Sequence, residues 1–106
     1  YLLAVDGLGR FLDEQESMTR DRRSLDRGIA IIGDVLAREH EKNAKNEAGA
    51  FRAQGGILSN LYSRLAHLYF KRVMYESEEK RQETWALSKW AEQQAVALRA
   101  EMGEDE

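Results

Sequence analysis

The side chains best suited to metal binding or general base catalysis are those of the two histidines. Neither histidine has the neighbouring residues that such a site needs. His40, within residues 38–41, begins like the zinc-binding helix of metalloproteases, but that motif needs a second histidine four residues later, where this chain has Ala44. His67 has no acidic residue within one helical turn on either side, so a carboxylate to orient it must come from a distant segment. We therefore interpret His67 as an ordinary helix histidine and expect no metal site.

The remaining patterns typical of catalysis are fragments. Cysteine is absent, which excludes a cysteine nucleophile, a thiolate zinc site and a disulfide framework. Gly7 and Gly9 match only part of a dinucleotide-binding fingerprint, because no strand precedes them and the third glycine is missing. Adjacent acids such as Glu78 and Glu79 stand beside lysine and are typical of a solvated face. The sequence therefore predicts a protein that is not an enzyme and uses no cofactor.

Nucleic-acid binding is the main alternative function, because the charges are unevenly distributed. Residues 1–47 carry ten acids and eight bases, residues 48–75 carry four bases and no acid, and residues 76–106 carry nine acids and four bases. The acid-free segment contains Gly55-Gly56, which suits the turn of a helix-turn-helix around residues 47–72.

In this alternative, polar side chains of the second helix meet base edges and basic side chains meet phosphates. The residues assigned to these contacts are Ser59, Asn60, Ser63 and Arg64 for bases and Arg52, Lys71 and Arg72 for phosphates. Against it, the chain has a net charge of −3 and its bases are sparse for a phosphate-binding surface. A buried central helix explains the low acid content equally well.

The composition is typical of a soluble, helix-rich chain. Its 106 residues suit one domain, with 42% apolar residues, 33% charged residues and no proline. The longest apolar runs, residues 1–5 and 29–32, are too short to cross a bilayer or to form the apolar part of a signal peptide. We expect a single all-α domain over residues 1–106, located in the cytoplasm and without membrane contact.

Apolar spacing predicts the first two helices. A short segment over residues 8–16 has Leu8, Phe11 and Leu12 on one side, and the glycines before it lead us to expect weak structure over residues 1–18. A second helix over residues 20–44, capped by Ser17 or Thr19, carries a stripe at i, i+4, i+7 and i+11. Its members are Leu25, Ile29, Ile32 and Leu36. A buried strand over residues 29–32 is the alternative, and we prefer the helix because the periodicity continues beyond both neighbouring glycines.

The second half of the chain contains no glycine or proline from Ile57 to Met102. After a connection over residues 43–56, a third helix begins near Ile57, and a fourth covers about residues 79–102 before a frayed acidic tail at 103–106. The expected core face of the third is Leu58, Leu61, Tyr62, Leu65, Tyr69 and Val73, widened by Ile57 and Leu68, and that of the fourth is Leu87, Trp90, Ala91 and Leu98. Residues 76–84 offer no apolar anchor, so the chain either turns near Ser77 or projects as one helix; compactness favours an antiparallel hairpin.

Large apolar residues that fall off these faces are the candidate binding residues, because a monomer has no need of them on its surface. They are Phe70 and Met74 on the third helix, Trp85 and Val96 on the fourth, and Ile31 and Val35 on the second. Trp, Phe and Met are enriched at protein interfaces. For Phe70 and Met74 the alternative is ordinary core, since the third helix of a bundle can be covered on several sides.

We therefore expect an all-α bundle of three to four helices with a C-terminal hairpin, which forms a homodimer. Its predicted function is to bind a larger protein, such as a transcription regulator, and to occlude or escort it. The format resembles that of small regulatory proteins, which is an analogy of format alone.

Overall fold

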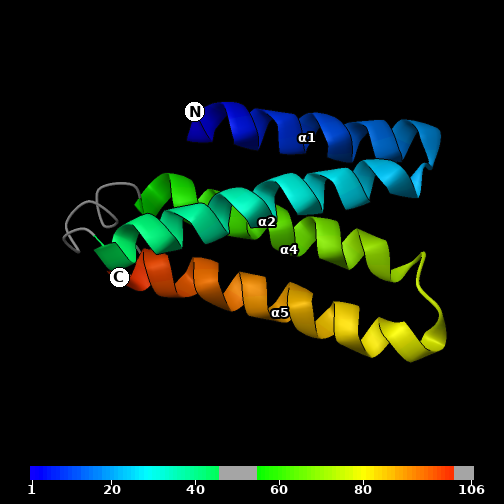
Figure 1. Cartoon of the computed structure of the whole chain (residues 1–106). Coiled ribbons are helices and arrows are strands. Elements are labelled where there is room, and N and C mark those ends of the chain that lie inside the picture. Colours follow the sequence, from blue (N-terminus) through cyan, green and yellow to red (C-terminus); the bar gives the residue numbers. More distant parts are fainter. Residues whose placement is uncertain (46–54, 102–106) are drawn as a thin grey trace.

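The structure is a computed structural model that describes residues 1–45 and 55–101. Over these residues it consists of four helices without a strand: α1 (Leu2–Thr19), α2 (Arg22–Lys45), α4 (Gly55–Val73) and α5 (Glu78–Glu101). The predicted all-α bundle is confirmed. Arg52 and the tail at 103–106 lie outside the described residues. Figure 1 shows α1 and α5 on opposite sides of the molecule, with α2 and α4 between them.

Helix α1 is longer and more regular than the sequence predicted. The prediction of weak structure over residues 1–18 is wrong, because the helix begins at Leu2 and continues to Thr19. Its buried positions are spaced i, i+3, i+7, i+10 and i+14, and they are Leu2, Val5, Gly9, Leu12 and Glu16. The apolar pair in the first turn anchors the start, so the glycines do not loosen it. Leu8 and Phe11, expected in the core, are exposed.

The connection between α1 and α2 consists of two residues. Arg20 takes a left-handed conformation with φ 56°, and its backbone N–H donates to the carbonyl of Glu16, which ends α1. Asp21 then caps α2, because its Oδ1 accepts a hydrogen bond from the Arg23 backbone N–H at 2.9 Å. The predicted cap at Ser17 or Thr19 is therefore wrong: the Thr19 hydroxyl donates to the Gln15 carbonyl within α1.

Two glycines let α1 and α2 approach their neighbours closely. A Cβ built on Gly9 would lie 2.8 Å from Ile32 Cδ1, and a Cβ built on Gly28 would lie 2.9 Å from Leu68 Cδ1. Both contacts are shorter than van der Waals distance, and Ile32 and Leu68 are fully buried. Gly28, inside the second helix, is thus a packing requirement.

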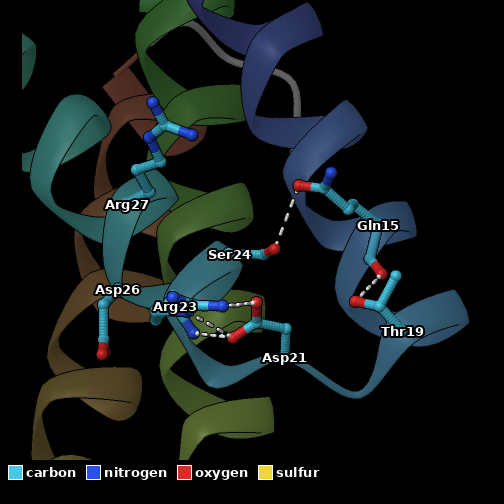
Figure 2. A pocket seen from close by; sticks show the side chains of 7 residues that line it. All are labelled: Gln15, Thr19, Asp21, Arg23, Ser24, Asp26 and Arg27. Atoms are coloured by element: carbon cyan, nitrogen blue, oxygen red, sulfur yellow. Dashed lines mark hydrogen bonds and ion pairs between the residues drawn. The ribbon is translucent and has the colours of Figure 1, made fainter.

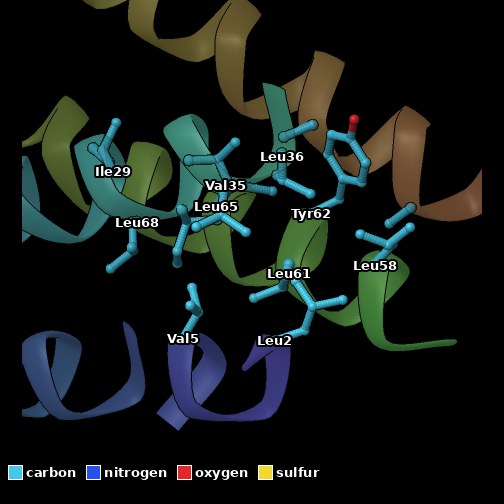
Figure 3. Packing of buried hydrophobic residues seen from close by; sticks show 14 of the residues in the cluster. Leu2, Val5, Ile29, Val35, Leu36, Leu58, Leu61, Tyr62, Leu65 and Leu68 are labelled. Carbon is cyan, nitrogen blue, oxygen red and sulfur yellow. The ribbon is translucent and has the colours of Figure 1, made fainter. Parts of the chain in front are cut away.

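The predicted core stripe of α2 and most of that of α4 are buried. Leu25, Ile29, Ile32 and Leu36 pack with Leu58, Leu61, Tyr62, Leu65 and Leu68. Figure 3 shows Leu2 and Val5 of α1 pointing toward Leu61 of α4. Tyr69 and Ile57 are half-buried against the same core. Helix α4 packs against each of the other three helices, which explains why so many of its positions are apolar.

The hairpin of α4 and α5 is confirmed, and the single projecting helix is excluded. Residues 74–77 form the turn, in which the backbone N–H of Tyr75 donates to the Arg72 carbonyl at 2.9 Å. The turn is held by the buried Glu76, not by an apolar side chain. Its Oε1 accepts hydrogen bonds from Arg72 at 2.8 Å and from Arg22 of α2 at 3.1 Å, and the Thr84 hydroxyl of α5 approaches at 3.5 Å.

Helix α5 turns small residues toward α4. Its buried positions are Thr84, Ser88, Ala91, Ala95 and Leu98. The Ser88 hydroxyl donates to the Ala66 carbonyl at 2.8 Å, so the two helices approach closely. Leu87 and Trp90, predicted as core, are exposed on the flank of this face. Trp90 nevertheless stacks edge-on against Tyr62, which also contacts the His40 ring.

We predict opposite effects for alanine at different glycines. Gly9→Ala and Gly28→Ala should each destabilise the fold by about 1 kcal/mol, because overpacking costs more than the gain in helix propensity. Gly33→Ala is the matched control in α2: a Cβ there meets nothing within 4 Å, so the fold should gain about 1 kcal/mol. Urea denaturation measures all three, and stabilisation by Gly9→Ala or Gly28→Ala would show that the close packing is absent.

The pH dependence of stability tests the Glu76 cluster. The hydrogen bond from Arg72 holds the pKa of Glu76 below its ordinary value, and the positive charges of Arg22 and Lys80 act in the same direction. A lowered pKa stabilises the folded state above the ordinary carboxyl range of about 4, and this stabilisation is lost as the pH falls through the folded pKa. Glu76→Gln should therefore lower the melting temperature at pH 7, with a difference from wild type that shrinks toward pH 3. The exposed Glu83→Gln control should show no such trend.

Candidate protein-binding groove

Four of the six predicted binding residues lie on the surface. Phe70, Met74, Trp85 and Val96 are between 38% and 63% exposed. Val35 is buried in the core, so its assignment to a binding surface is wrong, and Ile31 is half-buried against that core. The reason is that α2 packs against both α1 and α4, which buries a wider face than the predicted stripe.

Phe70 and Trp85 meet across the junction of α4 and α5. Their ring centroids are 5.6 Å apart at an interplanar angle of 51°, and the Lys89 ammonium lies 5.4 Å from the Trp85 ring. Both rings stay partly exposed because the small residues of α5 occupy the helix contact and leave the large ones at its edge. The sequence predicted Phe70 and Trp85 as interface residues, each on its own helix. It did not predict that the two rings contact each other.

The pair lies at one end of a groove whose floor is the outer face of α4. The floor positions are spaced i, i+3, i+7 and i+10, and they are Asn60, Ser63, His67 and Phe70. A hollow of about 340 Å³ lies between this floor and α5, where Trp85, Lys89 and Glu92 line it. A second hollow of about 330 Å³ lies toward α1, where Asp6 and Arg10 line it. The two hollows share Ser63 and His67, so they adjoin.

Ion pairs join α1 to α4 next to the groove. Asp13 lies 3.2 Å from His67 Nε2 and 2.6 Å from the Lys71 ammonium. This is the carboxylate that His67 lacked in the sequence, and it comes from a different helix. Only the tertiary packing of α1 on α4 brings the two together, so no local pattern could have revealed the pair.

The buried Glu16 completes this network. The Tyr75 hydroxyl donates to Glu16 Oε1 at 3.0 Å, and the Lys71 ammonium lies 3.0 Å from Oε2 in an ion pair. Burial lowers the pKa of Lys71, but its hydrogen bonds with Asp13 and Glu16 outweigh that effect, and the net pKa is raised. Lys71 is therefore a charged structural link between α1 and α4.

Three basic residues assigned to the nucleic-acid alternative form ion pairs within the protein. Arg64 pairs with Asp6 at 3.4 Å, Lys71 pairs with α1, and Arg72 lies 2.8 Å from Glu76 and 3.6 Å from Asp26. Gly55 and Gly56 form the first turn of α4. Asn60 is exposed and lines the hollow next to Arg64. Three of the four proposed basic contacts thus have acidic partners, which lowers their attraction for phosphate.

A different hollow, of about 640 Å³, lies between the end of α1 and the start of α2 (Figure 2). Its polar side chains bind one another: the Ser24 hydroxyl donates to Gln15 Oε1 at 3.0 Å, and Arg23 forms hydrogen bonds with both carboxylate oxygens of Asp21. We therefore assign this hollow to the helix junction and not to a ligand.

Other site classes find no support in the described part of the chain. Residues 1–45 and 55–101 bring together no group of three or more histidine, aspartate or glutamate side chains that could hold a metal ion. Over the same residues, no helix combines the length and the apolar content that crossing a membrane requires. Comparison of the chain with protein-family models, curated proteins and solved structures finds no match.

A double-mutant cycle tests the ring contact in the groove. Phe70→Ala and Trp85→Ala should show a coupling free energy of about 1 kcal/mol in urea denaturation, the usual value for an aromatic pair. Phe70→Ala combined with Leu87→Ala is the matched control, because Leu87 lies on the opposite flank of α5, and its coupling should be near zero. Equal coupling in both cycles would contradict the contact.

Proposed function

We propose that the protein is a non-enzymatic binding module that takes an amphipathic helix of a larger protein into the groove over α4. The observation that carries this proposal is the exposed Phe70–Trp85 pair at the apolar end of a groove between helices. Met74, four residues after Phe70, is also exposed. Aromatic side chains and methionine bury much area at interfaces, and helix-in-groove binding uses apolar anchors spaced along one face of the bound helix.

The groove changes character along its length, which defines the partner's chemistry. Around Phe70 and Trp85 it is apolar, whereas around Asn60, Ser63 and Arg64 it is polar and carries charge. A complementary helix has large apolar residues at one end and polar residues at the other. Lys89 and Glu92 at the rim favour charged partners on the flank of that helix.

The proposed mechanism is occlusion or escort. A partner helix with such an apolar face must be covered, or it will associate with other proteins. Binding in the groove covers that face and withholds it from the partner's own assembly. Regulation of a transcription regulator in this way is one form of the proposal, and it depends on the identity of the partner.

Affinity capture from cells that produce the protein tests the proposal. The wild-type chain should retain one protein in stoichiometric amount after nuclease treatment, and Phe70→Asp and Trp85→Glu should each lose it because a carboxylate then occupies an apolar contact. Leu87→Asp is the matched control, since Leu87 is similarly exposed but lies outside the groove. All variants should keep the helical circular dichroism spectrum.

Two results would contradict the proposal. Retention of the partner by Phe70→Asp and Trp85→Glu would place binding elsewhere on the surface. Loss of all captured proteins on nuclease treatment would instead favour the nucleic-acid alternative.

A further inference from the structure

The outer face of α1 carries an unpartnered apolar seam. Alternating steps of three and four residues connect six exposed positions, of which the first is the N-cap residue and the other five lie on the helix: Tyr1, Ala4, Leu8, Phe11, Gln15 and Met18. This is the a/d spacing of a coiled coil. The four large apolar side chains among them are between 41% and 85% exposed. The seam lies about 110° around α1 from the buried stripe, so packing within the chain does not use it.

We infer that this seam pairs with the same seam of a second copy, in antiparallel orientation about a two-fold axis. With the axis between residues 9 and 10, Tyr1 faces Met18, Ala4 faces Gln15 and Leu8 faces Phe11 of the second copy. Every seam position then meets another seam position, as an isologous interface requires. The pairing follows from positions in the sequence and the regularity of α1.

A hollow on the seam is lined by residues with the spacing of a coiled-coil hole. About 270 Å³ of space is lined by Phe11, Glu14, Gln15 and Met18, with Thr19 at its edge. These first four residues have the spacing of the four that surround each inserted side chain in knobs-into-holes packing. In the antiparallel register, Ala4 of the second copy lies level with this hollow and Tyr1 lies at its rim.

The exposed area agrees with a dimer interface. If a fully exposed large side chain contributes about 200 Å², the four large side chains expose on the order of 500 Å². The exposed area of the seam is increased further by Ala4, Gln15 and the flanking side chains. The total area comes near the roughly 800 Å² that each partner buries in a standard interface.

Charge favours a second copy as the occupant. The six seam positions carry no charge, although a third of the chain's residues are charged, so the face meets its own copy without repulsion. Glu14 flanks the seam, but in the antiparallel register it lies about 13 Å along the axis from Glu14 of the second copy, beyond the Debye length of about 10 Å at 0.1 M salt.

Analytical ultracentrifugation of the chain tests the inference. The wild type should sediment as a concentration-dependent dimer, and Phe11→Glu and Met18→Glu should each lower the association constant at least about a hundredfold, since the symmetry places each carboxylate in the interface twice. Met18 is 85% exposed, so its replacement leaves the monomer folded. Phe70→Asp should retain the dimer, which separates this surface from the groove. A monomeric wild type, or dimers that survive both seam variants, would overturn the inference.

Cysteine cross-linking tests the orientation, because the chain has no cysteine of its own. A mixture of Ala4→Cys and Gln15→Cys should form a disulfide-linked heterodimer, whereas either variant alone should not, since identical positions lie about 16 Å apart along the axis. Cross-linking of Ala4→Cys with itself would overturn the antiparallel register.

Discussion

The arrangement depends on one constraint, which is that α4 is packed by three other helices. Its face toward α1 and α2 carries large apolar residues such as Leu61 and Leu65, whereas α5 packs against it mainly with small side chains. An exposed strip of α4 remains between α1 and α5, and the groove lies there. The same helix is thus the centre of the core and the floor of the candidate site, so a change in its packing alters both.

Polar groups, in place of apolar anchors, fix one end of this assembly, where the α1–α2 and α4–α5 turns lie together (Figure 1). Glu76 joins α2, α4 and α5 at the turn of the hairpin, and Glu16 joins α1 to α4 through Lys71 and Tyr75. Buried carboxylates are costly unless they are paired, so these contacts tolerate few other arrangements of the helices. An arrangement of the helices that separates one of these pairs leaves an unpaired buried charge. The network therefore helps to determine which helix faces pack together.

The sequence was sufficient for the number of helices and for the hairpin, because regular apolar spacing and the polar interval at residues 76–84 are local signals. It failed in part for α5, where the usual assumption that large apolar residues face the core does not hold: Ala91 and Leu98 are buried as predicted, but Leu87 and Trp90 are exposed, and the small Ala95 is buried in addition. It failed for α1 for the same reason, since Gly9 and Glu16 occupy the buried stripe in place of Leu8 and Phe11. Small and charged residues are buried here only because of contacts between helices. Such contacts produce no periodic apolar pattern in the sequence.

The two proposed surfaces use different flanks of α1, and this separation has a physical consequence. Asp6 and Asp13 face α4 and the groove, about half a helical turn from the seam centred on Leu8 and Phe11. Under the proposed pairing, the seam is covered while both grooves stay open, and the two grooves are held at a fixed spacing. A partner that presents two helices, or that is itself dimeric, then binds with an effective concentration set by this fixed spacing. The uncharged, symmetric seam of α1 thus suits a second copy, whereas the groove, which is graded from apolar to polar, suits a different protein.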